Sequence, residues 1–279
     1  MMKKILVTGA NGYIGRYLVK KLLQQNYEVV AYVRDLGKMP AWLLGSPKLE
    51  VLEGNLADKL SLEKTVEGVD IIFHLAAALR MFEKDKELHK TNILGLQNLL
   101  QACQKANRPI KFIFASSIDA EKRAFTDYGK SKLKGEKIVK EFTQKNPQIE
   151  HIIVRIGNVY GGVEGGMVEG IRQQVLKNDW RASILYYCLS DKPLYLIAIE
   201  KLVDHLVKQA SDSEVKNRVL TLVEERTTVK ELVSHLKKEK LIANYPKKLP
   251  LDKVVLKIWQ FLGRIFKRAD LLIYLSFGK

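Results

Sequence analysis

The sequence predicts an α/β fold with a doubly wound parallel sheet and a smaller C-terminal substrate-binding region. Short apolar runs alternate with helical segments along residues 1–161, which is typical of repeated strand–helix–strand units. A glycine-rich turn at residues 9–15 joins the first apolar run to the first helical segment. We expect the ligand at the carboxyl ends of the strands, because open parallel sheets bind their ligands there.

The first unit consists of a strand predicted at Lys3–Thr8, the glycine turn, and a helix marked by leucines at helical spacing. Gly9, Gly12 and Gly15 form a G-x-x-G-x-x-G variant of the dinucleotide fingerprint. Their missing side chains permit a tight turn, a close approach of the pyrophosphate, and close packing of helix on strand. The helix N-terminus then presents free N–H groups to the phosphates. The expected cofactor contacts in this turn are Gly9, Asn11, Gly12, Tyr13, Ile14 and Gly15.

The second strand, Glu28–Val33, ends near the position where an acidic residue grips the ribose hydroxyls of NAD(H) in such folds. Val33 occupies that position, and Arg34, which can accommodate a 2′-phosphate, follows it. The pattern therefore favours NADP(H) as the cofactor. NAD(H) remains the alternative, because Asp35 is near enough in sequence to reach a ribose.

The strand and helix order continues along the next 60 residues. The predicted segments are a strand and loop at Glu50–Asp58, a strand at Val69–Leu75, a helix at Leu88–Ala106, and a strand at Lys111–Ala115 that ends in Ser116 and Ser117. His74 lies in an apolar run, so we interpret it as a packed residue and assign it no catalytic role. The repeated βαβ order indicates a Rossmann-type sheet.

The segment YGKSK places Tyr128 and Lys132 at positions i and i+4. In a helix, the phenol and the ammonium group would project on the same side, one turn apart. A tyrosine with a pKa near ~10 is a poor base at neutral pH, but a nearby cation favours the phenolate and lowers that pKa. The spacing predicts an acid/base pair. The alternative is a solvated Tyr and Lys on a helix surface.

Several further segments occur in the order that one protein family shows. They are TGANGYIG, GNLAD, HLAA, TNILGLQNLL, FIFASS, YGKSK and RIGNVYG. Together they resemble the extended short-chain dehydrogenase/reductases, the NAD(P)-dependent epimerase/dehydratase group, over residues 3–161. A weaker resemblance continues through Pro193–Leu206 and the segment VLTLVEERTTVKELVSHL.

The resemblance implies roles for four catalytic residues. Tyr128 would exchange a proton with the substrate oxygen, and Lys132 would lower the pKa of Tyr128 and bond the nicotinamide ribose. Ser117 would hold the same oxygen, with its neighbour Ser116 as the alternative. Asn92 would shape the site and its proton relay, although serines at a strand end and an Asn in a helix also serve as ordinary caps and backbone partners. The cofactor contacts implied in addition to the glycine turn are Arg34, Asn55, Leu56, Leu75, Ala76, Ala77, Tyr128 and Lys132.

Three departures from the family pattern leave the substrate open. Ser117 and Tyr128 are 11 positions apart, whereas extended members usually have a longer loop there. Asn55 replaces the usual aspartate beside the adenine, although an amide carbonyl also accepts hydrogen bonds. Ile156 and Gly162 stand where prolines are common.

The composition excludes few partners by itself. The chain has 47 Lys and Arg against 31 Asp and Glu, a net charge of +16, which attracts anions of many kinds. No uninterrupted apolar stretch approaches the ~20 residues of a membrane span, and the strand-like start leaves no room for a signal peptide. Cys103 and Cys188 have neither metal-ligand nor disulfide spacing. We expect a cytoplasmic protein without a metal site, and we do not favour nucleic acid as its partner.

The C-terminal region is predicted to span residues 162–279 and to bind substrate, with parts of 190–222 returning to the main sheet. Glycines within Gly161–Gly166 suggest a loop or a lid hinge. Three basic residues that follow could clamp a phosphorylated substrate, although solvated helix charges are the favoured interpretation. They are Arg172, Lys177 and Arg181. Asp252–Arg268 has a basic stripe and a broad apolar face, which favours internal or homodimer packing over contact with a membrane surface.

The expected activity is hydride transfer between NADP(H) and a carbonyl or secondary alcohol of a small molecule, such as a sugar or nucleotide sugar. The pattern does not separate an epimerase or dehydratase from a reductase. One alternative is a sensor or scaffold that binds NADP(H) without turnover. Another is an RNA-binding or membrane-binding member of the same fold, which the basic charge motivates.

Overall fold

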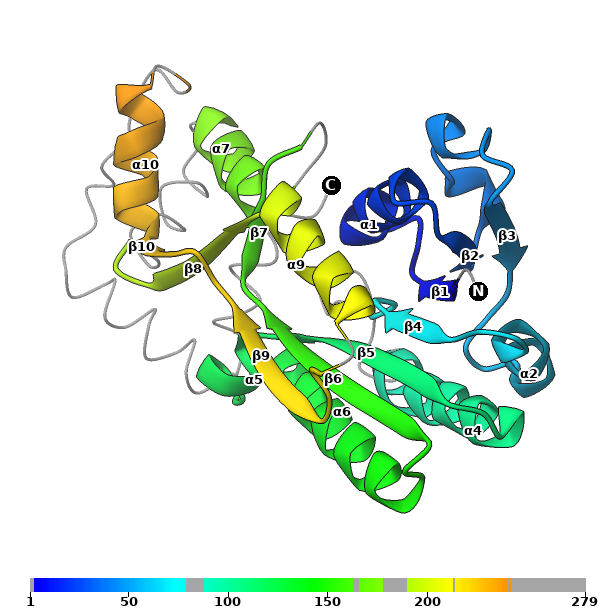
Figure 1. The fold of residues 1–279 in the computed structure, drawn as a ribbon. Coiled ribbons are helices and arrows are strands. Elements are labelled where there is room, and N and C mark those ends of the chain that lie inside the picture. The colour runs from blue at the N-terminus through cyan, green and yellow to red at the C-terminus, as the bar shows by residue number, and fades with distance from the viewer. Residues whose placement is uncertain are drawn as a thin grey trace. The chain divides into compact units, whose positions relative to one another are not determined.

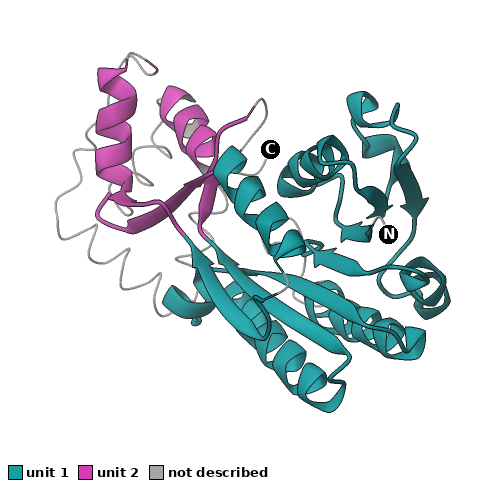
Figure 2. Cartoon of the chain, in the orientation of Figure 1, with its two compact units in different colours: residues 1–156, 199–222 teal, residues 157–198, 223–279 magenta. Residues whose placement is uncertain are grey.

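The computed structural model of the chain describes residues 3–78, 88–162, 166–177, 190–212, 214–239 and 241. The chain divides into two compact units, which Figure 2 colours separately. Unit 1 comprises residues 1–156 and 199–222, and unit 2 comprises residues 157–198 and 223–279. The chain therefore leaves unit 1 after the sixth strand and returns to it for one helix and one strand.

Unit 1 is built on a parallel sheet, which confirms the predicted fold class. Within the described residues the sheet has seven strands in the order β3-β2-β1-β4-β5-β6-β9, and each neighbouring pair is parallel (Figure 1). The strands are β1 (Lys4–Thr8), β2 (Glu28–Val33), β3 (Leu49–Glu53), β4 (Ile71–His74), β5 (Ile110–Ser117), β6 (Ile149–Ile156) and β9 (Arg218–Leu222). The order reverses direction between β1 and β4, and ligands of such sheets bind at this switch point.

Helices cover both faces of this sheet. They are α1 (Tyr13–Gln24), α2 (Lys59–Val66), the π-helix η3 (Lys90–Gly95), α4 (Leu96–Ala106), α5 (Asp119–Lys122), α6 (Asp127–Lys145) and α9 (Ile199–Ser211), with two short 3₁₀ turns, η1 (Leu36–Lys38) and η2 (Ala41–Leu43). α2, α4 and α6 pack on one face, and α1 packs against α9. Their apolar residues recur at helical spacing, so one side of each helix is buried.

The main core lies between the sheet and the layer of α2, α4 and α6. Alternate residues of the strands, such as Leu6, Ile72 and Phe112, meet Leu99 and Val139 of the helices, and all five are fully buried. Parallel strands buried on both faces form near-continuous apolar runs, which explains why the sequence pattern identified them. This rigid core fixes the strand ends that carry the site.

Unit 2 contains a small mixed sheet and two described helices. The order is β10-β8-β7, with β8 antiparallel to β10 and parallel to β7. The elements are β7 (Asn158–Tyr160), α7 (Met167–Lys177), β8 (Pro193–Ala198), β10 (Glu225–Thr228) and α10 (Val229–Lys238). Thr228 and Glu231 form a reciprocal capping box at the start of α10.

Several expectations for the C-terminal region concern residues that the structure does not describe. Arg181, Cys188 and the segment Asp252–Arg268 lie outside the described residues, as does the middle of Gly161–Gly166. Arg172 is described, and its guanidinium donates to the Glu169 carboxylate at 2.7 Å. This ion pair agrees with an ordinary helix charge. Among the described residues, no helix is both long and apolar enough to cross a membrane.

Some element boundaries differ from those predicted. The predicted helix at Leu88–Ala106 contains a π-helical turn, Lys90–Gly95, before the regular helix α4. β5 extends two residues beyond the predicted strand end, so Ser116 and Ser117 both belong to the strand. Since side chains alternate along a strand, these two serines point to opposite faces of the sheet. The short helix α5, which the sequence pattern did not indicate, then leads into α6.

Candidate active site

The glycine turn between β1 and α1 depends on close backbone packing. Gly9 has φ of +71°, and a Cβ atom there would lie 2.8 Å from the Ala76 backbone nitrogen. A Cβ on Gly15 would lie only 2.2 Å from the Gly9 carbonyl oxygen. Neither contact leaves room for a side chain, so both positions require glycine. The predicted reason for the fingerprint, close packing of turn, strand and helix, is present in the structure.

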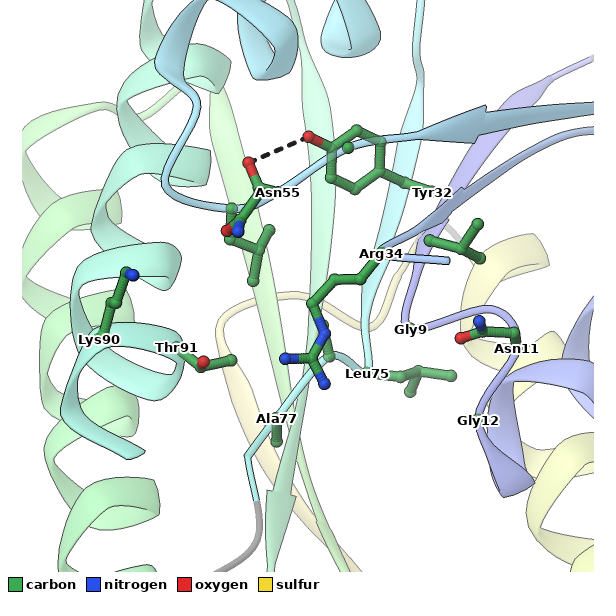
Figure 3. Close-up of a pocket in the computed structure, with 14 residues that line it drawn as sticks. Gly9, Asn11, Gly12, Tyr32, Arg34, Asn55, Leu75, Ala77, Lys90 and Thr91 are labelled. Atoms are coloured by element: carbon green, nitrogen blue, oxygen red, sulfur yellow. Dashed lines mark hydrogen bonds between the residues drawn. The ribbon is translucent and has the colours of Figure 1, made fainter. Parts of the chain in front are cut away.

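A pocket of about 210 Å³ opens beside this turn (Figure 3). It is lined by Gly9, Asn11, Gly12, Tyr32, Val33, Arg34, Gly54, Asn55, Leu56, Leu75, Ala76, Ala77, Lys90 and Thr91. Pockets for whole ligands usually measure ~300–1,000 Å³, so this one fits part of a dinucleotide. Its position, between the glycine turn and the ends of β2, β3 and β4, matches the adenosine half.

The charges that line the pocket are positive. Arg34 and Lys90 both line it, and its lining includes no Asp or Glu. In Figure 3 the Arg34 side chain extends into the space between the glycine turn and Thr91. Asp35, the other candidate for a ribose contact, does not line the pocket, and its carboxylate accepts from Gly37 N at 3.0 Å and pairs with Lys38 at 3.0 Å. Bonding to Lys38 lowers the pKa of Asp35.

Hydrogen bonds fix the loops around the pocket. The Tyr32 hydroxyl donates to the Asn55 backbone oxygen at 3.1 Å, which ties β2 to the loop after β3 (Figure 3). The Asn11 amide donates to the Asp35 backbone oxygen at 3.1 Å. The Asn98 amide of α4 donates to the Leu56 backbone oxygen at 2.9 Å. The pocket walls are therefore held in place by the protein itself.

The expected adenine contact, Asn55, is itself partly engaged. Its side-chain oxygen accepts from Ala57 N at 2.9 Å, an interaction that closes the turn after β3. Burial raises the pKa of the neighbouring Tyr32 phenol, which therefore stays protonated and able to donate. An amide oxygen has a second lone pair, so Asn55 can still accept a hydrogen bond from a ligand.

Tyr128 and Lys132 lie in the first turns of α6, as the YGKSK spacing predicted for a helix. Thr126 caps this helix: its hydroxyl accepts from Gly129 N at 2.9 Å. The Lys132 ammonium group is buried, donates to the Ala115 backbone oxygen at 2.7 Å, and lies 5.8 Å from the centre of the Tyr128 ring. Tyr128 is half-buried. The structure therefore places the ammonium group of Lys132 beside the ring of Tyr128.

Burial changes the protonation of the groups around Lys132. It lowers the pKa of Lys132 to about 8, while the Glu136 carboxylate acts in the opposite direction. Burial, with the charge of Lys132, lowers the pKa of His74 to about 3. His74 shares a hydrogen bond of 2.8 Å with the Thr8 hydroxyl and stacks on Phe114. It is thus a neutral, packed residue, which agrees with the sequence interpretation.

The two serines at the end of β5 have different partners. The buried Ser116 hydroxyl donates to Glu136 Oε1 at 2.6 Å. The half-buried Ser117 hydroxyl accepts from Asp119 N at 3.1 Å, so its own hydrogen remains to be donated. Ser117 is therefore better suited than Ser116 to hold a substrate oxygen.

A buried ion pair sits one turn beyond Lys132. Glu136, 2% exposed, accepts two hydrogen bonds from Arg155 of β6, at 2.9 and 2.8 Å. Arg155 also donates to Glu121 of α5 at 2.9 Å. Bonding to Glu136 raises the pKa of Arg155. These contacts join α5 and α6 to the ends of β5 and β6, which fixes the rotation of the catalytic helix.

Asn92 connects separate parts of the site. Its side chain is 5% exposed and bonds the backbone of Ala78 and the hydroxyl of Ser131 on α6. It thus lies next to α6, the helix that bears Tyr128.

The predicted site residues form two groups. The cofactor residues that line the pocket are Gly9, Asn11, Gly12, Arg34, Asn55, Leu56, Leu75, Ala76 and Ala77. Tyr13, Ile14 and Gly15 belong to the turn and to the start of α1 but do not line the pocket, and the Tyr13 ring contacts Tyr17 and Arg16 instead. The residues of the catalytic group, which lie at β5, η3 and α6, are Ser117, Asn92, Tyr128 and Lys132.

Sequence reasoning missed five pocket residues as contacts. They are Tyr32, Val33, Gly54, Lys90 and Thr91. Thr91 belongs to the TNILGLQNLL segment and Gly54 to GNLAD, so both adjoin residues that the pattern did identify. Lys90 depends on the π-helical turn, for which the sequence carries no clear signal.

The glycine turn, the switch-point pocket and the turn that holds the half-buried Tyr128 beside the buried Lys132 define a dinucleotide-binding protein of the Rossmann type. The cradle that glycines leave open and the cationic lining fit a dinucleotide. The chain belongs to the NAD dependent epimerase/dehydratase family, whose model matches residues 5–187. It is therefore an extended short-chain dehydrogenase/reductase, as the sequence motifs predicted.

Three similar proteins illustrate this family. The bifunctional dihydroflavonol 4-reductase/flavanone 4-reductase of Malus domestica is 39% identical over 123 residues, 41% of this chain and 35% of that protein. The D-erythronate dehydrogenase of Haemophilus influenzae is 31% identical over 176 residues, 56% of this chain and 55% of that protein. The UDP-glucuronic acid 4-epimerase of Bacillus cereus, solved with NAD, has a TM-score of 0.70 at 23% identity, covering 88% of this chain and 87% of that one.

These similarities differ in what they establish. The chain spans about a third of the length of the plant reductases that it matches. The structural likeness to the epimerase, below 25% identity, concerns the fold. The relatives include reductases, dehydrogenases and epimerases, so family membership alone does not select one reaction.

Proposed function

We propose that the protein is an NADP(H)-preferring oxidoreductase that transfers hydride between the cofactor and a carbonyl or secondary alcohol. The observation that carries the proposal is the catalytic turn of α6, where the buried Lys132 ammonium group lies 5.8 Å from the centre of the Tyr128 ring. A buried cation beside a half-exposed phenol is the arrangement needed to move a proton at a substrate oxygen. Nucleotide sugars and small ketones are the substrate classes we favour.

Each residue of the catalytic group has a separate task. When bound, NADPH supplies the hydride to the carbonyl carbon, a chemistry that belongs to the cofactor. Tyr128 donates its phenolic proton to the oxygen of that carbonyl, which becomes the hydroxyl of the product. Lys132 stabilises the phenolate that remains. Ser117 donates its free hydrogen to the same oxygen and orients it toward Tyr128. In the oxidation direction, the phenolate takes the proton back.

Lys132 also has the capacity to bind the cofactor. An ammonium group has three hydrogens, and Ala115 takes one of them in the structure. The other two suit ribose hydroxyls of the nicotinamide half, which we propose as their partners. Held in this way, Lys132 serves the cofactor and Tyr128 together.

The preference for NADP(H) rests on the adenosine pocket. Arg34 and Lys90 line it without any acidic residue, so a 2′-phosphate would gain attraction there, whereas the ribose hydroxyls of NAD(H) would lack the usual carboxylate. Asp35, the residue behind the NAD(H) alternative, does not line the pocket, and its carboxylate accepts from Gly37 N and pairs with Lys38, which supports the preference.

We also propose that a second copy of the chain is a partner. Leu94 of η3 and Leu133 of α6 are 46% and 43% exposed, and these two elements are in contact. Exposed leucines on adjoining helices favour packing against another apolar surface. Sedimentation or light scattering would test this: a dimer in the native protein that dissociates in Leu133→Lys supports it, and a monomeric native protein contradicts it.

A substrate screen tests the proposed activity. The protein would be incubated with NADPH or NADH and a panel of nucleotide sugars, small ketones and hydroxyketones, with cofactor oxidation followed by absorbance and sugar epimers separated by chromatography. We expect at least one class to react, faster with NADPH than with NADH. Tight cofactor binding with no reaction across the panel would instead favour a sensor or scaffold.

A further inference from the structure

The side chain of Asn92 has no hydrogen-bonding hydrogen left for a substrate or a water. Its oxygen accepts from Ala78 N at 2.7 Å. Its nitrogen donates to the Ala78 backbone oxygen at 3.1 Å and to Ser131 Oγ at 3.0 Å. An amide nitrogen has two hydrogens, and both are donated within the protein. Asn92 therefore uses both hydrogens of its amide to connect protein segments and has none to donate to a substrate or a water.

Ser131 continues the connection to the catalytic turn. Its hydroxyl accepts from Asn92 and donates to the Tyr128 backbone oxygen at 2.8 Å. Ser131 is 7% exposed and immediately precedes Lys132. The hydroxyl thus has one partner on η3 and one within the first turn of α6. A buried polar chain in which each member is satisfied holds its members in one geometry.

At its other end, the hydrogen-bonded chain adjoins two segments that line the pocket. Ala78 follows Ala76 and Ala77, which line the pocket, and Asn92 follows Lys90 and Thr91, which also line it. Asn92 bonds both the N–H and the carbonyl of Ala78, so the loop after β4 cannot shift without it.

The π-helical turn η3 carries both the contacts with the pocket and the contact with α6 within a few residues. Three consecutive residues, Lys90, Thr91 and Asn92, include two that line the pocket and one that bonds the catalytic helix. Single π-helical turns occur often at functional sites. At the end of the same turn, a Cβ atom on Gly95 would lie 2.8 Å from the Leu56 side chain, another pocket residue. The turn is therefore packed tightly between the pocket and α6.

We propose that Ser131 is a positioning residue that acts with Asn92 to tie the catalytic turn of α6 to the wall of the adenosine pocket. Filling the pocket then changes the surroundings of Tyr128 through the chain Ala78, Asn92, Ser131 and Tyr128. This inference rests on the proposed function, since it takes the pocket to be the adenosine site. It assigns Asn92 a connecting role in place of the proton relay.

The test uses a probe that fills the pocket without reaching the catalytic turn. Adenosine 2′,5′-bisphosphate carries the adenosine half of NADP(H) and lacks the nicotinamide. The full chain would be labelled with ¹³C-tyrosine, and the Tyr128 signal assigned by its loss in Tyr128→Phe. Tyr128 does not line the pocket, so the probe has no lining contact with it, and the variants below separate a shift that passes through the hydrogen bonds from one caused by the charge of the phosphates. We expect such a shift in the native protein.

Two variants break the connection, and one serves as the matched control. Ser131→Ala and Asn92→Ala should each reduce the probe-induced shift of Tyr128 to less than half of its native size, while the probe still binds. Their effects should not add in the double variant, because both remove the same link. Ser211→Ala is the control: Ser211 also donates to the carbonyl three residues earlier, Lys208, but is exposed. It should leave the shift unchanged.

The outcomes separate this inference from the proposed function. A native shift that persists in full in Ser131→Ala, or a probe that binds without moving Tyr128, overturns the inference and leaves the proposed function standing. If neither this probe nor adenosine 5′-diphosphate binds, the proposed function is contradicted. The positioning role is then tested by the chemical shift of the Tyr128 signal in the protein without probe. We expect Ser131→Ala and Asn92→Ala each to change this chemical shift, with no further change in the double variant. An unchanged chemical shift in both variants overturns the positioning role.

Discussion

The pocket that we propose for the adenosine half of the cofactor and the turn of α6 that we propose as catalytic are constructed in different ways. Glycines and alanines form one part of the pocket lining, beside Arg34 and Lys90, and its walls are tied by bonds to backbone oxygens such as those of Asn55 and Leu56. The catalytic turn depends on long buried side chains, above all Lys132 and Glu136, that bond groups on other strands. A change in the glycine turn beside the pocket therefore alters shape, whereas a change of Lys132 or Glu136 alters buried charge, and the two kinds of variant should fail in different ways.

Gly15→Ala should produce the largest effect, because the added side chain would collide with the backbone of the glycine turn beside the pocket. The new Cβ would lie 2.2 Å from the Gly9 carbonyl oxygen, and overpacking of this kind costs about 3 kcal/mol or more. We expect a lower free energy of unfolding and loss of dinucleotide binding, measured by denaturation and calorimetric titration. The matched control is Gly45→Ala, whose Cβ would meet nothing within 4 Å. Equal changes in the free energy of unfolding and in dinucleotide affinity for the two variants would show that the backbone contact at Gly15 does not decide the outcome.

Glu136→Gln should destabilise the catalytic half without touching the pocket. It removes the carboxylate charge that faces Arg155, which is partly buried and keeps its bond to Glu121, so we expect a loss of about 1–3 kcal/mol. Glu141→Gln is the control, since its carboxylate is 58% exposed and 3.7 Å from Lys137. We expect the free energy of unfolding in urea to fall for the first variant and to stay nearly constant for the second. A similar small change in both would show that the buried pair contributes little.

The pH dependence of turnover should report the charge of Lys132. Its pKa is lowered by burial to about 8, so the ammonium form that supports Tyr128 is lost as the pH rises through about 8. Turnover should fall on that side, by about tenfold per pH unit for a single ionisation. A rate that stays constant up to pH ~9.5 would contradict the assignment.

The same shift affects stability in the opposite direction. The pKa of Lys132 in the folded protein lies below the ordinary value of 10.5, so the unfolded chain binds more protons between about 8 and 10.5. The contribution of Lys132 to the free energy of unfolding therefore rises with pH in this window. We expect the free energy of unfolding of the native protein to rise between pH about 8 and 10.5 while its turnover falls. Opposite trends in the two measurements would separate the effect of Lys132 on stability from its effect on catalysis.

Arg34→Gln should have the smallest effect of these variants, and it tests whether Arg34 binds the 2′-phosphate of NADP(H). Loss of one charge-assisted hydrogen bond to a 2′-phosphate costs about 1.5–3 kcal/mol, so NADP⁺ affinity should fall about tenfold or more while NAD⁺ affinity changes little. Lys105→Gln, which removes an exposed cation that pairs with Glu63 and does not line the pocket, is the control. Tighter binding of NAD⁺ than NADP⁺ by the native protein would overturn the preference.

The two halves also differ in how far the sequence predicted them. The glycine turn and the strand ends were predicted because they obey local rules: a backbone that has no room for a Cβ atom, and apolar runs that have to be buried. YGKSK was informative for the same reason, since its two groups lie one helical turn apart. In both cases the spacing along the chain decides the spacing in the fold.

The parts that were not predicted depend on contacts between distant segments. Glu136 and Arg155 are 19 positions apart and meet only because α6 packs on β6. Ser116 and Ser117 have different hydrogen-bond partners because β5 extends over both residues and because Glu136 lies within reach of Ser116. Lys90 and the Asn92–Ser131 contact require the π-helical turn, for which composition and periodicity give no rule.

The most direct test of the account compares Tyr128→Phe with the native protein in two measurements on the same preparation. Dinucleotide affinity by titration should remain within about threefold, because Tyr128 does not line the adenosine pocket, while turnover should fall by about 10²–10⁴, the usual contribution of a positioned acid/base group. Undiminished turnover in Tyr128→Phe would contradict the assignment of this phenol as the proton donor.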